Sequence, residues 1–215
     1  MTGKRVIIVI VILVAVLMIA WIAVGYFSVR GLEGPGYIVA EKKAGYEIRR
    51  YRDYVVAETT VEGDYASSTR DGFRRLFGYI SGNNTSRKAI AMTAPVVSHN
   101  ESLSEKIAMT TPVISAEGKD RWSLAFVMPS RYSLDALPVP LDNRVKLRRV
   151  PGETVAVSSF SWYVSEARLG EKSAELAALL NADGRRVREM KSARYDPPFS
   201  PPFMKRNEVW AVLEE

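Results

Sequence analysis

The chain has 215 residues, of which 47% are hydrophobic and 25% are charged, an ordinary composition for a folded protein of one or two domains. Its formal net charge is +6, from 30 basic and 24 acidic residues that are interspersed along the chain. A nucleic-acid-binding face needs concentrated basic residues with aromatic side chains among them, so the sequence predicts no nucleic-acid partner. The absence of cysteine excludes disulfides and thiolate metal sites.

The first predicted element is the segment 6–27, which is apolar and contains no charged residue. A membrane-spanning helix needs about 20 such residues. Trp21 and Tyr26 lie near the far end of the segment, where the aromatic residues of a membrane interface are found. The pattern predicts a short basic leader over 1–5, a transmembrane helix or uncleaved signal anchor over 6–27, and a Gly-rich linker over 28–36.

A cleaved signal peptide is the alternative for this segment. The apolar region of a signal peptide is shorter, about 7–15 residues, and ends in a small-x-small site, for which Ala23-Val24-Gly25 could serve. Lys4 and Arg5 precede the apolar run and favour an N-terminus inside the cell. We therefore expect a single-pass protein of the cell membrane, with the bilayer as a partner and the folded domain on the extracytoplasmic side.

The folded domain is expected over 37–215 and begins with strand patterns. Tyr46–Tyr51 alternates apolar and charged residues, as a half-buried strand does. Val55–Val61 is rich in Val and Thr and is predicted to be its partner strand, joined to it through Arg52-Asp53. The first half of the domain is thus predicted to open with a hairpin.

A helix is predicted to follow, beginning at Asp64 or Ser67, which can both act as N-cap, and ending near Ile80. Arg70, with two further arginines, flanks its apolar stripe. The residues of this stripe fall at helical spacing and are Ala66, Thr69, Phe73, Leu76, Phe77 and Ile80. The spacing indicates a helix that packs one face on a sheet.

Two similar apolar-Ala-Met-Thr-x-Pro-Val stretches come next, at 90–97 and 107–114. Each is predicted to be a short strand interrupted at its proline, because proline cannot donate a hydrogen bond to a neighbouring strand. The stretches place Met92 and Met109 in matched positions, and the polar residues 98–106 between them are predicted to form a loop that contains His99. These methionines are candidates for soft groove walls, weak thioether ligands or plain packing.

The second half repeats the first. Lys146–Val150 has the pattern of Glu47–Tyr51, a second helix is predicted over 165–180, and a last strand over 208–213. The pseudo-repeats, 46–129 and 145–213, are each too small to bury both a sheet and a helix alone. The predicted fold is therefore α+β: a duplicated β-α-β unit that forms a distorted antiparallel barrel or curved sheet with two main helices.

Catalytic patterns are nearly absent from the sequence. His99 is its single histidine, and it contains no Gly-x-Ser-x-Gly turn, Walker loop or dinucleotide fingerprint, so no enzyme activity is predicted. What remains is a binding surface in which Phe73, Phe77, Met92 and Met109 offer apolar contact beside Arg70. A flat apolar ligand with carboxylates would match it. The alternative is that the aromatic residues are core and the arginines face water.

Besides the doubled Met-Thr-x-Pro-Val stretch, the domain contains five further motifs: Tyr46-x-Ile48-Arg49-x-Tyr51, Gly72-Phe73-x-x-Leu76-x-x-Tyr79-Ile80-x-Gly82-x-Asn84, Phe126-x-Met128-Pro129, Tyr195-Asp196-Pro197-Pro198 and Arg206-Asn207-Glu208-Val209-Trp210. In this combination of motifs, the chain from about residue 37 to its C-terminus resembles the SOUL/heme-binding protein family, and the doubled stretch resembles prokaryotic members.

The resemblance implies non-covalent binding of heme or another porphyrin in an apolar groove beside the first domain helix, in a carrier, buffer or sensor. By position the groove residues are Phe73, Phe77 and Arg70, with Met92 and Met109 as its walls. Axial ligation is not uniform in the family, which leaves His99 as a candidate metal ligand. Two alternatives remain: a sensor of general amphipathic small molecules, and a membrane-tethered structural or interaction domain without a ligand.

Overall fold

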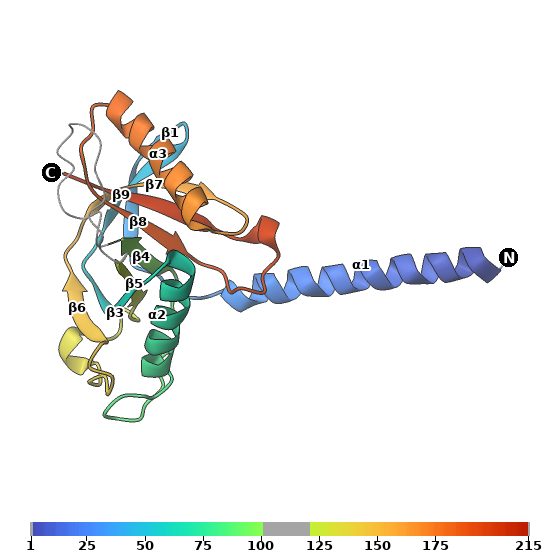
Figure 1. Cartoon of the computed structure of the whole chain (residues 1–215), viewed down its shortest axis with the longest axis horizontal. Helices are drawn as coiled ribbons and strands as arrows, with labels where there is room; N and C mark the ends of the chain where they lie inside the picture. The colour runs from blue at the N-terminus through green and yellow to red at the C-terminus, as the bar shows by residue number, and fades with distance from the viewer. Residues whose placement is uncertain (1, 101–120, 215) are drawn as a thin grey trace.

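A computed structural model describes residues 2–100 and 121–214 of the chain. A single antiparallel sheet of nine strands curls into a half-barrel, two helices pack on its outer face, and a third helix projects away from the domain (Figure 1). This confirms the predicted α+β class with two main domain helices. The second Met-Thr-x-Pro-Val stretch, and Met109 with it, lies outside the described residues.

The projecting helix is α1, Thr2–Val29. It is helical throughout because its long run of apolar residues contains no proline. The first glycine with a positive φ, Gly31 at 81°, follows the helix and ends it after Val29. Its segment Gly3–Val29 is long and apolar enough to cross a membrane, a test that a signal sequence also passes.

The nine strands come in two matching sets plus one. The sheet order is β1-β2-β7-β9-β8-β4-β5-β3-β6. The first half contributes β2 to β5 and the second half β6 to β9, each with a helix after its second strand. The strand bounds are β1 Tyr37–Lys43, β2 Tyr46–Tyr51, β3 Tyr54–Glu62, β4 Val96–Asn100, β5 Arg121–Val127, β6 Lys146–Val150, β7 Thr154–Phe160, β8 Val187–Arg194 and β9 Asn207–Leu213.

The two halves are related by an approximate two-fold axis between β4 and β8. With β1 set aside, we can exchange β2 with β6, β3 with β7, β4 with β8 and β5 with β9. The exchange gives the same strand order, read from the opposite edge of the sheet. Among the described strands β1 alone has no counterpart. The first strand of each half pairs with the second strand of the other half, β2 with β7 and β6 with β3. The halves are therefore interlocked and share one sheet.

This interlocking corrects the predicted hairpin of β2 with β3. The strands lie far apart in the sheet order, because the chain crosses between them at Arg52-Asp53. The equivalent crossing between β6 and β7 runs beside it. Tyr51 N donates to Glu153 O at 2.9 Å, and Gly152 N donates to an Asp53 carboxylate oxygen at 2.7 Å. The crossings thus tie the two ends of the curled sheet together.

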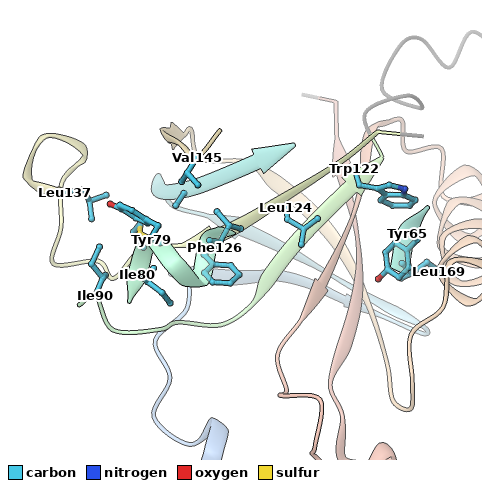
Figure 2. Close-up of a cluster of buried hydrophobic side chains, with 13 residues drawn as sticks. Tyr65, Tyr79, Ile80, Ile90, Trp122, Leu124, Phe126, Leu137, Val145 and Leu169 are labelled. Atoms are coloured by element: carbon cyan, nitrogen blue, oxygen red, sulfur yellow. The ribbon is translucent and has the colours of Figure 1, made fainter. Parts of the chain in front are cut away.

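Helix α2, Tyr65–Ile80, begins as predicted, because the Asp64 side chain accepts hydrogen bonds from the N–H groups of Ala66 and Ser67. A Cβ atom on Gly72 would stand only 3.2 Å from Leu124, so this glycine lets α2 lie close on β5. Leu76 is fully buried on that face. Figure 2 shows the resulting core, which includes Tyr65, Tyr79, Ile80, Trp122, Leu124 and Phe126.

Helix α3, Glu166–Ala182, repeats this arrangement on the other half of the sheet. The Ser165 side chain caps it by accepting from Arg168 N, and Leu176 and Leu180 are fully buried against β7, β8 and β9. Among the described residues, two 3₁₀ turns accompany these elements, η2 at Leu134–Ala136 and η3 at Pro202–Met204.

Three further local predictions are corrected. The stretch before Pro95 is not a strand; β4 begins at Val96, after the proline that cannot donate to a sheet. His99 lies within β4 rather than in a polar loop, paired with Ser123 of β5. The strand β8 was not predicted, because its residues Val187–Arg194 alternate with charged side chains that turn out to be paired inside the half-barrel.

Candidate functional site

The outer surface of α2 carries an exposed aromatic pair. Phe73 and Phe77 are 36% and 48% exposed, and their rings stack with centroids 6.0 Å apart and planes 10° from parallel. The edge of Phe73 also meets the buried ring of Phe126 at 5.3 Å. The pair is thus fixed at its base by the core and open to solvent above it. We call this pair the aromatic face of α2.

The segment 90–95 is held near α2 by the backbone. Ile90 N donates to Ile80 O at 2.7 Å, at the end of α2, and the buried Thr93 hydroxyl donates to Val127 O of β5. Ala94 N donates to Glu33 O at 3.0 Å. Met92 lies between these tethers and is 37% exposed. The first copy of the twin motif therefore builds an irregular, tightly bonded segment that presents a methionine.

Arginines line the exposed side of α2. Arg70 is exposed, and no ion pair joins it to another of the described residues. Arg74 pairs with Asp71 at 3.4 Å, and Arg75 donates to Thr60 O at 3.1 Å. Arg70 is therefore the arginine of this helix best placed to pair with a carboxylate that approaches from solvent.

The corresponding surface of α3 differs. Alignment of the two helices on the fully buried Leu76 and Leu176 places Ser173 and Ala177 where α2 has Phe73 and Phe77. Both helices are held on the sheet by buried leucines. The fold thus accommodates small residues at these outward positions, and the aromatic pair of α2 exceeds what helix packing requires.

His99 lies on the other face of the sheet from α2. It pairs with Ser123, which is adjacent in β5 to the α2-facing Leu124, and successive residues of a strand point to opposite faces. Its Nε2 is 3.8 Å from a carboxylate oxygen of Glu189. Across residues 2–100 and 121–214, no group of three His, Asp or Glu side chains is placed to hold a metal ion. The structure does not bring His99 together with the aromatic face.

A buried charge network occupies the inner face of the half-barrel. Arg49 donates from two guanidinium nitrogens to the two carboxylate oxygens of Glu208, both at 3.0 Å. Both side chains are almost fully buried. Burial disfavours the ionised carboxylate of Glu208 and so raises its pKa. Hydrogen bonds from Arg49, Tyr195 and Trp210 outweigh this effect and hold the pKa below the usual value. This network was not predicted as a unit, although its residues fall in the motifs of β2 and β9.

A cavity of about 430 Å³ lies beside this network. Arg206 stacks over the Tyr195 ring at 4.2 Å, and Tyr37 contacts Tyr51 at 5.1 Å. The residues that line the cavity come from the end of α1, the linker, β1, β2 and the β8–β9 connection, and are Val29, Leu32, Gly34, Pro35, Tyr37, Tyr51, Ala94, Tyr195, Asp196, Met204 and Arg206. Sequence reasoning missed this cavity because its walls come together only through the sheet topology.

The fold and these surfaces define a non-covalent binding module on a duplicated scaffold. The family model for SOUL heme-binding proteins matches residues 32–212, and the chain belongs to this family. It is 31% identical to heme-binding protein 2 of Homo sapiens over 192 residues, which cover 86% of this chain and 88% of the human protein. It is also 27% identical to heme-binding protein 1 of Xenopus laevis over 169 residues, which cover 78% and 83%.

Solved structures share the fold at low identity. The C-terminal domain of EcmrR matches with a TM-score of 0.56 and 9% identity, over 79% of this chain and 97% of that domain. A hydrolase from Listeria innocua matches with a TM-score of 0.55 and 14% identity, over 81% and 94%. At such identities these similarities establish the architecture alone.

Proposed function

We propose that this chain binds heme or a related tetrapyrrole non-covalently on the aromatic face of α2, as a membrane-held carrier, buffer or sensor and not as an enzyme. The observation that carries the proposal is the exposed, stacked pair of Phe73 and Phe77. Family membership supports the ligand class. The contrast with Ser173 and Ala177 of α3 supports a role for the pair beyond packing.

The residues fit the chemistry of a tetrapyrrole. The ligand is a broad apolar ring system with carboxylates at one edge. Covering the part of each phenylalanine ring that is still exposed would contribute about 0.5–1.5 kcal/mol, and the flexible side chain of Met92 can adapt to the ring surface. Arg70 can meet a carboxylate bidentately. When bound, heme would add the redox and ligand-binding chemistry of its iron; the chain itself supplies a surface that holds and shields the ring.

The membrane anchor is the second part of the proposal. We propose that residues 1–5 are a leader on the cytoplasmic side, that 6–27 cross the cell membrane once, that 28–36 are the linker, and that 37–215 form an extracytoplasmic domain. The apolar length of α1 supports the crossing, and Lys4 and Arg5 support the orientation.

Titration of the detergent-solubilised full chain with hemin, followed by its Soret band, tests the binding proposal. We expect saturable binding at micromolar hemin and a loss of at least about tenfold in affinity for the F73A/F77A variant. Phe203→Ala is the control, because Phe203 is a similarly exposed phenylalanine on another surface. Equal affinities of wild type and F73A/F77A would exclude the aromatic face as the site.

Metal-free protoporphyrin IX separates ring stacking from iron ligation. If the aromatic face supplies the affinity, the metal-free ring binds within a few-fold of hemin, and His99→Ala changes neither value. A large preference for hemin that His99→Ala abolishes would instead assign the iron to the inner face of the sheet.

The 430 Å³ cavity favours a second candidate function, binding of a smaller amphipathic molecule. Its volume is typical of ligand sites, and its walls combine tyrosine rings and Arg206 with the apolar Val29 and Leu32. Met204→Trp would fill this cavity without touching α2. If this variant loses hemin binding and F73A/F77A retains it, the cavity replaces the aromatic face as the tetrapyrrole site.

A further inference from the structure

A second exposed aromatic surface lies on two loops far from α2 in sequence. Trp162 and Tyr163 belong to the β7–α3 connection, and Phe199 and Phe203 to the β8–β9 connection. Their exposed fractions are 49%, 56%, 55% and 55%. Large apolar side chains gathered on a surface mark an interaction site. We call these four residues the loop aromatic patch.

The two loops are fixed to each other by hydrogen bonds. Trp162 N donates to Pro202 O at 2.9 Å, and the Asn207 side chain donates to Trp162 O at 2.8 Å. Trp162 has a φ of 84°, a conformation that a tryptophan rarely adopts and that costs free energy. The buried Lys205 donates to the carbonyls of Pro197 and Pro198. The patch is therefore held in place by the fold, with about half of each of its four side chains exposed.

The patch lies on the side of the domain from which α1 leaves, as Figure 1 shows for η3 and the adjacent loop. Trp21 Nε1 donates to Phe199 O at 2.7 Å. A Cβ atom on Gly25 would stand 2.7 Å from a side-chain carbon of Pro201, so helix and loop are in close contact there. Both contacts on α1 fall within its apolar segment Gly3–Val29.

These contacts set the depth of the patch relative to a bilayer. Trp21 precedes Phe27, the end of the proposed spanning segment, by six residues, or about 9 Å of helix. With α1 across the bilayer, a loop packed against Trp21 lies at or below the level of the headgroups. Interfacial elements bury their apolar faces to a similar depth, about 5–10 Å, and Trp and Tyr favour this zone.

We propose that the loop aromatic patch inserts into the interfacial zone of the same bilayer that α1 spans. The inference rests on the proposed membrane anchor. The domain then has two attachments to the membrane, α1 and the patch, and is held in one orientation rather than swinging on residues 30–36. The ligand-binding domain would then lie at a fixed height above the bilayer, where it can meet molecules that arrive from the lipid phase.

The absence of cysteine from the chain makes the proposal directly measurable. Single cysteines at Phe203, Val139 and Ile10 can each carry a nitroxide in the full chain reconstituted into phosphatidylcholine–phosphatidylglycerol vesicles. Phe203 reports on the patch, and Ile10 reports on the membrane-spanning part of α1, four residues after the start of the proposed span. Val139, which is 62% exposed, reports on the loop after η2, which lies on the side of the domain away from α1 (Figure 1). Relaxation by oxygen and by a water-soluble nickel chelate gives the depth of each label.

We expect the Ile10 label inside the bilayer near its other face, the Phe203 label at the interfacial depth and the Val139 label in water. A Phe203 label as accessible to nickel as the Val139 label overturns the proposal, and the Ile10 label then shows whether the anchor also fails. In a third outcome, the Phe203 labels of neighbouring chains broaden each other by dipolar coupling and are not accessible to nickel. The patch would then bind a second copy of the chain, which also overturns the proposal.

Gly25→Leu gives a second test that leaves the patch itself unchanged. The larger side chain must push Pro201 away from α1. The Phe203 label is then expected to become several-fold more accessible to nickel, while the Ile10 label stays immersed. An unchanged Phe203 label in this variant would contradict a depth set by the α1 contact.

Discussion

The two halves of this domain share a scaffold and differ in what they place on it. In each half, a capped helix lies on the sheet through fully buried leucines, Leu76 in α2 and Leu176 in α3. On the outward side α2 has a stacked phenylalanine pair, whereas α3 has Ser173 and Ala177. Duplication therefore separates requirements of the fold, which both halves meet, from features that one half added.

The inner face shows the same division for charge. Arg49 of β2 and Arg148 of β6 occupy equivalent positions in the interlocked strands. Arg49 pairs with Glu208 in full burial, but Arg148 pairs with Glu58 at 2.6 Å with 45% of its side chain exposed. A buried ion pair is costly to break, whereas an exposed one contributes little. One arginine thus forms a buried pair that is costly to break, and its counterpart forms a partly exposed pair.

The largest effect we expect concerns these two pairs. Glu208→Gln should lower the free energy of unfolding by about 3–5 kcal/mol, because it removes the fully buried counter-charge of Arg49 and leaves only the partly exposed Glu47 to pair with it. Glu58→Gln should lower it by only about 1 kcal/mol or less. Chemical denaturation of the detergent-solubilised full chain measures both values. Equal losses would show that the pairs are not distinguished by burial.

The dependence of stability on pH sharpens the same contrast. Burial raises the pKa of Glu208, but its hydrogen bonds outweigh this effect and bring the pKa below the ordinary 4.5. The stabilisation is therefore fully present above about pH 4.5 and is lost as pH falls through the lower, folded-state pKa. Unfolding midpoints measured from pH 7 to pH 3 should fall steeply for wild type and less steeply for Glu208→Gln. Parallel curves for these two proteins would contradict the account.

Exposed apolar residues provide the matching test on the helices. Phe77→Ala should lower hemin affinity about tenfold and change the free energy of unfolding by less than about 1 kcal/mol, because Phe77 is half exposed. Leu179→Ala on α3 is the control, since Leu179 is 40% exposed. Titration and denaturation of both variants separate binding from folding. A Leu179→Ala variant that loses as much affinity would show that the halves bind alike.

The smallest effect is expected at the arginines of α2. Arg70→Ala should weaken hemin binding by about fivefold or less at low salt, and the difference should shrink in 0.5 M salt, because exposed pairs are screened. Arg74→Ala is the control, because Arg74 already pairs with Asp71. Titrations at two salt concentrations measure both. A salt-independent loss at Arg70 would indicate a packing role for its stem.

Local signals predicted the helices well and the strand pairing poorly. Asp64 was predicted as a possible N-cap of the first helix, and the start of the second helix was predicted at Ser165, because an N-cap acts within three residues. The pairing of β2 with β3 was wrong because a two-residue connection suggests a hairpin, and nothing local shows that the chain crosses to the other half. Strand β8 was missed because its inward side chains, such as Lys191, are charged and find partners only in the folded half-barrel.

The candidate site was predictable in composition but not in exposure. Helical spacing placed Phe73 and Phe77 on one face of α2, yet such a stripe is usually core. The fold buries Leu76 and leaves Phe77 48% exposed, a difference that the spacing of the stripe does not contain. The cavity beside Tyr195 and the partner of Arg49 depend on strand order, which the sequence pattern did not contain.

Nuclear magnetic resonance of the full chain in lipid nanodiscs tests the central claim most directly, that the tetrapyrrole lies on the aromatic face of α2. The paramagnetic iron of hemin broadens nearby amide signals, and zinc protoporphyrin, which is diamagnetic, serves as the reference. We predict broadening of the amides of α2 around Phe73 and Phe77 and of the segment around Met92, with the signals of α3 unaffected. Broadening centred on the cavity around Tyr195 and Arg206, or on His99 in β4, would contradict the account.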